Sequence, residues 1–154
     1  MLTHRGKYGL KALVHLASLE PGVTAQATEI AKANAIPKKF LDTILTDLRK
    51  AGFVRAQKGP GGGYALALAP QEIRVGNVVR ALDGPLAPIE CASRTAYQPC
   101  DDCLDPEVCS VRLVMADVRD AMALILDNMT LAQMAARAET ASKWSSGKRN
   151  RKSK

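Results

Sequence analysis

Apolar residues recur at helical spacing in three successive segments of the first fifty residues. Residues 5–19 carry one apolar stripe, which predicts an amphipathic helix. A second helix is predicted over residues 25–33, and the turn 34–36 leads to a third helix that begins at about Pro37 and ends at about Lys50. On the third helix we expect the apolar side to be buried through Phe40, Leu41, Ile44, Leu45 and Leu48. A helix, a short turn and a second helix form the helix-turn-helix pattern.

Two short strands are predicted after the third helix, over residues 53–56 and 64–68. The glycine-rich loop between them lacks the Lys-Ser/Thr ending of a phosphate-binding P-loop. Its glycines instead permit a tight hairpin whose backbone can lie against a DNA backbone or minor groove, with Lys58 as the cation. A fourth short helix is predicted over residues 75–82. The fold class is therefore mainly α with a small β-hairpin wing, followed by a long helix.

A helix start is predicted at Asp105-Pro106-Glu107, with Asp105 as the cap and Pro106 at the first position, which would place Cys109 within the first turn. The long helix continues past this last cysteine. Its apolar residues recur about every 3.5 positions, the period of a helix-packing seam. They predict a dimerisation surface made of Val111, Val114, Met115, Val118, Met122 and Ile125. Packing within one chain is the alternative. Thr130 and Gln133 have the spacing of a capping box that opens a last short helix, and residues 140–154 are predicted to be a disordered basic tail.

Charge is unevenly distributed along the 154 residues, whose net charge is +7. Residues 1–82 hold 12 Lys/Arg against 5 Asp/Glu, and residues 83–139 hold 4 against 10. A basic first half is typical of a surface that binds a polyanion such as double-stranded DNA. The residues expected to contact DNA are Lys38, Lys39, Asp42 and Thr43 of the third helix, together with Lys58, Gly59, Pro60 and Gly61 of the wing. A merely solvated helix face is the alternative.

No apolar run approaches the roughly 20 residues that a membrane span requires, and no secretory signal is recognised. We therefore expect a cytoplasmic protein without a membrane partner. In that compartment clustered cysteines more often bind metal or take part in redox chemistry than form structural disulfides.

All four cysteines lie in one stretch, at Cys91, Cys100, Cys103 and Cys109. Four thiolates suffice for a 2Fe-2S or a 4Fe-4S cluster. Structural zinc is an alternative, although only Cys100 and Cys103 have the spacing of a zinc knuckle. A disulfide between these two residues would give a metal-free redox switch. A small redox enzyme is disfavoured because no βαβ pattern surrounds the pair, whereas a metal-stabilised interaction module without DNA binding remains open.

Four segments together resemble the IscR/NsrR-type winged-helix transcription regulators. They are Lys7–Leu10, Leu48–Val54, the wing Lys58–Tyr64 and Val75–Gly84, and the likeness extends from residue 1 to about 135. The resemblance implies a homodimer, with an iron–sulfur cluster between the DNA-binding part and the dimerisation helix in many members. It also implies that three of the ligands are Cys91, Cys103 and Cys109.

The fourth ligand of the family varies, and this chain departs from both familiar choices. Relatives with a histidine place it three residues after the last cysteine, where this chain has Arg112. Relatives with an acidic ligand place it before the aromatic residue of the first helix, where this chain has Lys7. Neither side chain ligates, so Cys100 is the expected substitute.

These interpretations divide the chain into four parts. Residues 1–84 are predicted to form a winged helix-turn-helix DNA-binding domain, and residues 85–110 a cysteine-rich cluster-binding loop. Residues 111–139 would form the dimerisation helix and a short terminal helix, and residues 140–154 the tail. The predicted function is a transcription regulator whose operator binding responds to iron, redox or nitrosative state through the cluster, or through zinc or a thiol switch.

Overall fold

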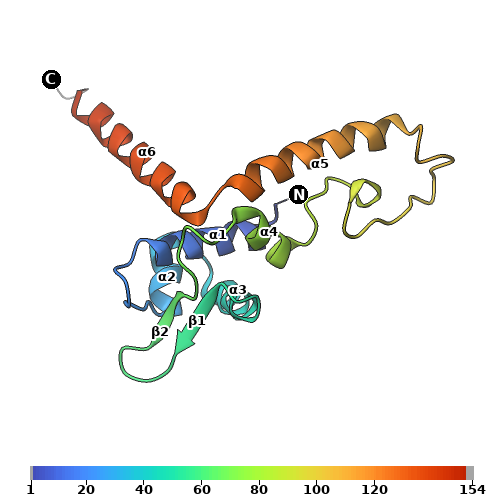
Figure 1. Cartoon of the computed structure of the whole chain (residues 1–154). Helices are drawn as coiled ribbons and strands as arrows, with labels where there is room; N and C mark the ends of the chain where they lie inside the picture. The colour runs from blue at the N-terminus through green and yellow to red at the C-terminus, as the bar shows by residue number, and fades with distance from the viewer. Residues whose placement is uncertain (1, 152–154) are drawn as a thin grey trace.

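The computed structural model describes the backbone of residues 2–151 and the side chains of residues 2–142 (Figure 1). It is mainly helical with one two-stranded hairpin, which confirms the predicted fold class. In chain order the described elements are α1 (His4–Ala17), α2 (Ala27–Asn34), α3 (Lys38–Lys50), β1 (Val54–Gln57), β2 (Gly63–Leu66), α4 (Val75–Asp83), the 3-10 helix η1 (Glu90–Ala92), α5 (Ser110–Asn128) and α6 (Leu131–Arg151).

Helices α1 to α4 pack around one aliphatic core, beside which the hairpin lies (Figure 1). The turn between α2 and α3 is closed by Ala35, whose left-handed backbone conformation (φ 51°) ends α2. This turn lets α3 cross α2 while the apolar faces of both helices stay in the core. Residues of this core with almost no exposed surface are Leu13, Ile30, Leu41, Ile44, Leu45, Leu48, Ile73, Val78 and Leu131.

The hairpin pairs β1 with β2 in antiparallel register, from Val54 opposite Leu66 to Gln57 opposite Gly63. Ala25, just before α2, extends this sheet: its N–H donates to the Tyr64 carbonyl (2.9 Å) and its carbonyl accepts from the Tyr64 N–H (2.8 Å). The wing is therefore attached by backbone hydrogen bonds to the start of the helix-turn-helix unit.

Helix α5 runs from the cysteine loop back toward α1 and α4, and α6 then leaves in a different direction (Figure 1). The junction between them is fixed on the winged domain. The Leu131 N–H donates to the Ile73 carbonyl (2.8 Å), and the Leu131 side chain is completely buried in the domain core. The predicted capping box is confirmed, since Thr130 N–H donates to Gln133 Oε1 (2.9 Å) and Gln133 N–H to Thr130 Oγ1 (3.1 Å).

Three local predictions were wrong. Phe40 is not buried, because 60% of its surface is exposed on the first turn of α3. The residues Asp105-Pro106-Glu107 form a turn, in which Glu107 N–H donates to Asp105 Oδ1 (2.9 Å), and α5 begins only at Ser110. Helix α6 continues to Arg151 and so includes most of the segment predicted to be a disordered tail. Residues 152–154 of that predicted tail lie outside the described part of the chain.

Candidate nucleic-acid interface and cysteine loop

The first two turns of α3 present a mixed polar surface. Lys38, Lys39 and Thr43 are exposed, and Asp42 is partly exposed. Lys38 forms an ion pair with Asp42 (2.7 Å). This pair neutralises the charge of Lys38. Among the described residues Lys39 has no ion pair, so its charge remains available on this surface. Phe40 adds an exposed aromatic ring that the apolar spacing assigns to the core. The end of α3 that can meet base edges thus carries charge, hydroxyl and aromatic groups.

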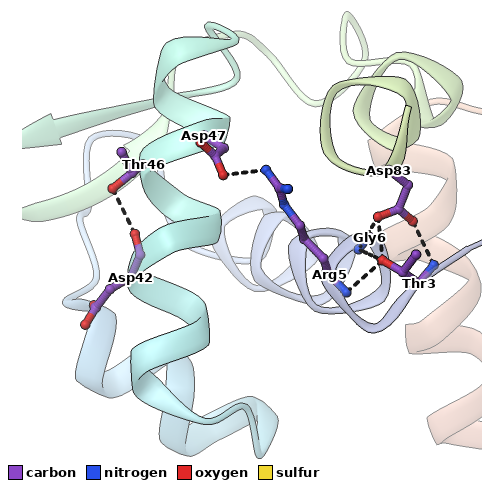
Figure 2. A network of polar contacts seen from close by, with 7 residues as sticks. All are labelled: Thr3, Arg5, Gly6, Asp42, Thr46, Asp47 and Asp83. Atoms are coloured by element: carbon purple, nitrogen blue, oxygen red, sulfur yellow. Dashed lines mark hydrogen bonds and ion pairs between the residues drawn. The ribbon is translucent and has the colours of Figure 1, made fainter. Parts of the chain in front are cut away.

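Polar contacts from α1 fix the position of α3 (Figure 2). The Arg5 guanidinium donates to the Asp47 carboxylate at 2.5 Å, on the side of α3 that faces α1. Arg5 itself lies in the first turn of α1, which Thr3 caps. Asp83, at the end of α4, accepts from the N–H groups of Thr3 (2.8 Å) and Gly6 (3.0 Å). A carboxylate at a helix N-terminus is favoured by the helix dipole, so one network joins α1, α3 and α4.

The wing tip, formed by Lys58, Gly59, Pro60 and Gly61, is exposed throughout. Gly59 and Gly61 have φ values of 92° and 71°, which side chains other than glycine rarely adopt. Thr24 Oγ1 donates to the Gly61 carbonyl (2.8 Å), so the tip is also tied to the segment before α2. The backbone of the tip is therefore held in place and carries few side chains, with Lys58 as its one cation. Such a tip can approach a DNA phosphate backbone closely.

The four cysteines lie in a loop that starts at η1 and ends where α5 begins. Cys91, in η1, is 5% exposed, whereas Cys100 is exposed and Cys103 and Cys109 are half-buried. Cys109 is the residue that precedes the first turn of α5 and accepts through its carbonyl from Leu113 N–H (3.0 Å). It lies one position before the helix rather than inside its first turn, still close to the positive end of the helix dipole.

The thiols of the loop raise the pKa values of Cys100 and Cys103. A hydrogen bond with the Cys91 thiol, partial desolvation and the charges of Cys91, Asp102 and Cys103 raise the pKa of Cys100 to about 11. Partial desolvation, the charge of Cys109 and a hydrogen bond with it raise the pKa of Cys103. Among the described residues, however, no three ligating side chains are placed to hold a metal ion. The loop thus gathers its thiols without a preformed three-ligand centre.

Arg112 occupies the position at which some members of the resembled family have a histidine ligand. Its side chain contacts the backbone of the cysteine loop. Its Nε donates to the Cys91 carbonyl (3.0 Å) and its Nη1 to the Pro106 carbonyl (3.1 Å). Lys7, at the other expected ligand position, is exposed on α1. The contact with Cys91 could not be predicted from the sequence because the two residues are 21 positions apart, and no local pattern joins them.

Helix α5 has no buried residue, although much of it is apolar. Val111 is 60% exposed and Ile125 61%, and Val114 and Val118 are also exposed, whereas Met115 and Met122 are half-buried. Two further leucines, Leu113 and Leu124, are exposed on the same helix. The predicted seam is thus uncovered within one chain, together with additional apolar surface.

Comparison with known proteins gives the family. Residues 2–137 match the family described as "Rrf2: Iron-dependent Transcriptional regulator". The chain is 45% identical over 146 residues to an rrf2-like HTH-type transcriptional regulator of Rhodobacter capsulatus, an alignment that covers 93% of this chain and 97% of that one. No helix in the described part is long and apolar enough to cross a membrane.

Solved structures agree. CymR, the global cysteine regulator of Bacillus subtilis, superposes with a TM-score of 0.73 at 28% identity, covering 89% of this chain and 97% of that chain. IscR of T. potens superposes with a TM-score of 0.71 at 28% identity, covering 92% and 90%. The chain therefore belongs to the Rrf2 family, as a winged-helix, DNA-binding transcription regulator and not an enzyme.

Proposed function

We propose that this regulator is a homodimer whose occupancy of its operator is modulated by an iron–sulfur cluster held by Cys91, Cys100, Cys103 and Cys109. One observation carries the proposal: all four thiols lie in the single loop that leads into α5. The signal it would report is iron, redox or nitrosative state. The cysteine loop and the uncovered helix are adjacent, so a change at the first can alter the pairing of the second.

DNA recognition is assigned to α3 and the wing. Lys38, Lys39, Asp42 and Thr43 would face base edges in the major groove, because they are accessible at the first two turns of α3. Lys58 and the exposed backbone of residues 59–61 would contact phosphates or the minor groove. A lysine gives a point charge and not a bidentate fork, so we expect the wing to contribute more affinity than sequence specificity.

Dimerisation is assigned to the apolar seam of α5. The exposed valines and Ile125 form a surface that water disfavours, and burying apolar surface contributes about 25 cal/mol per Å². A second copy of the same helix supplies a matching seam, as expected for an isologous interface. The two α3 helices would then be presented together to successive major grooves.

The donor set fits an iron–sulfur cluster in its chemistry. Thiolates are the usual ligands of such clusters, and Cys109 lies where the α5 dipole favours negative charge. A bound cluster would supply a redox-active group that reacts with oxidants or nitric oxide. The pKa values of the free Cys100 and Cys103 thiols are raised. A cysteine ligates as the thiolate, so both residues must lose their protons when a cluster binds.

A thiol switch is the second candidate, favoured by the presence of four thiols in one loop. The influence of Cys91 on the pKa of Cys100 makes a Cys91–Cys100 disulfide a candidate beside the Cys100–Cys103 disulfide suggested by spacing. Structural zinc would use the same four thiolates.

Purification without oxygen tests the cluster. We expect coloured protein that contains iron and acid-labile sulfide, and we expect Cys100→Ala to lose most of both. Colourless protein with one zinc per chain would support the structural-metal alternative, and metal-free protein with a reversible Cys91–Cys100 disulfide would support the switch. Unchanged cluster content in Cys100→Ala would show that another group is the fourth ligand.

Binding to duplexes selected from a random library tests the interface. Lys58→Ala should lower affinity and reduce the slope of log K against log salt by about 0.9 for each phosphate that the protein no longer neutralises. Arg94→Ala, which removes the same charge from the cysteine loop, is the matched control and should leave the slope unchanged. An unchanged slope in Lys58→Ala would remove the wing lysine from the interface.

A further inference from the structure

Arg112 stands in a place that is unfavourable for a cation. It lies in the first turn of α5, where the helix dipole favours negative charge. Its side chain is nevertheless drawn inward, and the Glu107 carboxylate at 3.9 Å is exposed and too distant for a strong ion pair. The compensation comes instead from two backbone carbonyls, those of Cys91 and Pro106.

These two carbonyls lie on opposite sides of Cys100 and Cys103 in the chain. One guanidinium therefore holds both ends of the segment 91–106 at the start of α5. The planar fork of arginine can reach two acceptors at once from a fixed geometry, which a lysine ammonium on a flexible stem does less well. Closing a loop of this length at one point also removes much of its conformational freedom.

A second arginine on the same side of α5 repeats the contact. Arg119, two turns after Arg112, donates to the carbonyl of Ala92, the neighbour of Cys91. Residues seven positions apart lie on one helix face, so Arg112 and Arg119 together seat η1 along α5. This seating accounts for the burial of Cys91 and of Ala92 beside it, whereas Cys100 farther along the loop is exposed.

We propose that Arg112 is a positioning residue that clasps the cysteine loop shut, holding Cys91 against the first turn of α5. On this assignment Arg112 binds the loop backbone at the position where histidine-containing relatives have a ligand. The fourth donor then comes from the loop that the clasp closes. This last step rests on the proposed function, whereas the clasp itself does not.

The clasp is tested on reduced, metal-free protein by measuring the rate at which N-ethylmaleimide alkylates each cysteine, with peptide mass spectrometry. Arg112→Ala should speed the alkylation of Cys91 about tenfold, because local opening no longer breaks two charge-assisted hydrogen bonds. Arg112→Lys should fall between the wild type and Arg112→Ala.

Arg94→Ala is the matched control, because this arginine lies in the same loop, pairs with the Asp120 side chain at the surface, and donates to no loop carbonyl among the described residues. It should leave the Cys91 rate unchanged. Equal protection of Cys91 in wild type, Arg112→Ala and Arg112→Lys would overturn the clasp. If Arg112→Ala does not fold by circular dichroism, the comparison of Arg112→Lys with Arg94→Ala decides the question.

Anaerobic reconstitution then tests the clasp's role in ligand placement. Iron and sulfide content should fall in Arg112→Ala and persist in Arg94→Ala. Full cluster content in an Arg112→Ala protein with rapidly alkylated Cys91 would overturn the positioning role. A wild type that takes up no cluster would refute the proposed function, and the alkylation rates would still decide whether Arg112 clasps the loop.

Discussion

Gly76 of α4 lies against the Asp127 carboxylate of α5, and this contact predicts an alanine substitution whose effect changes sign. A Cβ at Gly76 would lie 1.9 Å from Asp127 Oδ1, an impossible approach. That carboxylate accepts two hydrogen bonds from Arg80, at 2.6 Å and 2.8 Å. Gly76 has an ordinary helical backbone with a negative φ, so alanine can adopt its conformation. The carboxylate is therefore the group that a side chain at this position must displace.

The competing magnitudes are similar. Gly→Ala inside a helix stabilises by about 0.5–1 kcal/mol. The bidentate Arg80–Asp127 pair contributes about 1 kcal/mol once its partial exposure, 34% and 42% of the two side chains, is allowed for. Displacing the carboxylate adds about 1 kcal/mol of strain. Gly76→Ala should thus lower the free energy of unfolding by about 1 kcal/mol in the wild type. In an Asp127→Ala background it should raise that free energy by about 0.5–1 kcal/mol.

Urea unfolding of the four proteins in this cycle, at one fixed protein concentration, measures the coupling. Hydrogen bonds from Arg80 lower the pKa of Asp127, so the folded state favours the ionised carboxylate. The contribution of the pair is therefore complete above the ordinary carboxyl pKa of about 4 and is lost as pH falls through the lowered value. We expect full coupling at pH 7. If Gly76→Ala destabilises the Asp127→Ala protein as much as the wild type, the carboxylate is not what opposes the side chain.

Three further substitutions have expected outcomes. Gly6→Ala places a Cβ 2.2 Å from Asp83 Oδ2 and should cost about 1 kcal/mol in urea unfolding, because the carboxylate must leave the α1 N-terminus; an unchanged midpoint would contradict this. Leu131→Ala empties a fully buried site and should cost about 2–5 kcal/mol in the same assay, whereas a smaller loss would show that α6 is not part of the core. Phe40→Ala removes a largely exposed ring, so it should weaken binding to the selected duplexes while leaving the free energy of unfolding within about 0.5 kcal/mol. A large loss of stability, or unchanged DNA affinity, would return Phe40 to a structural role.

The helix-turn-helix unit and the wing were predictable because their signals are local. Apolar spacing at Leu41, Ile44, Leu45 and Leu48 identifies the buried side of α3, and all four are buried. Phe40 has the same spacing relative to Ile44 but lies at the exposed end of the helix. Spacing shows which side of a helix is apolar, and it does not show how far along the helix the core extends.

The start of α5 and the organisation of the cysteine loop were less predictable because they depend on tertiary contacts. Asp105 and Pro106 are good helix-starting residues, yet Asp105 caps an isolated turn at Glu107. The Pro106 carbonyl is used by Arg112 instead of a helical N–H group. A start signal of this kind is satisfied equally by a turn, so sequence alone does not fix where the helix begins. The arrangement of the thiols likewise depends on how the loop is folded back on α5.

The two ends of α5 are attached to different parts of the protein, and this decides how a signal can travel. Along its first half Arg112 and Arg119 hold the cysteine loop, and at its end Asp127 is bound to α4 through Arg80. A 19-residue helix is about 28 Å long, so a tilt of about 10° at one end displaces the other by about 5 Å. A displacement of that size is large compared with the tolerance of two reading helices that must enter successive major grooves about 34 Å apart. The proposed sensor therefore needs no rearrangement inside the winged domain, since a change in how the loop sits on the first turns of α5 is sufficient to misplace α3 on DNA.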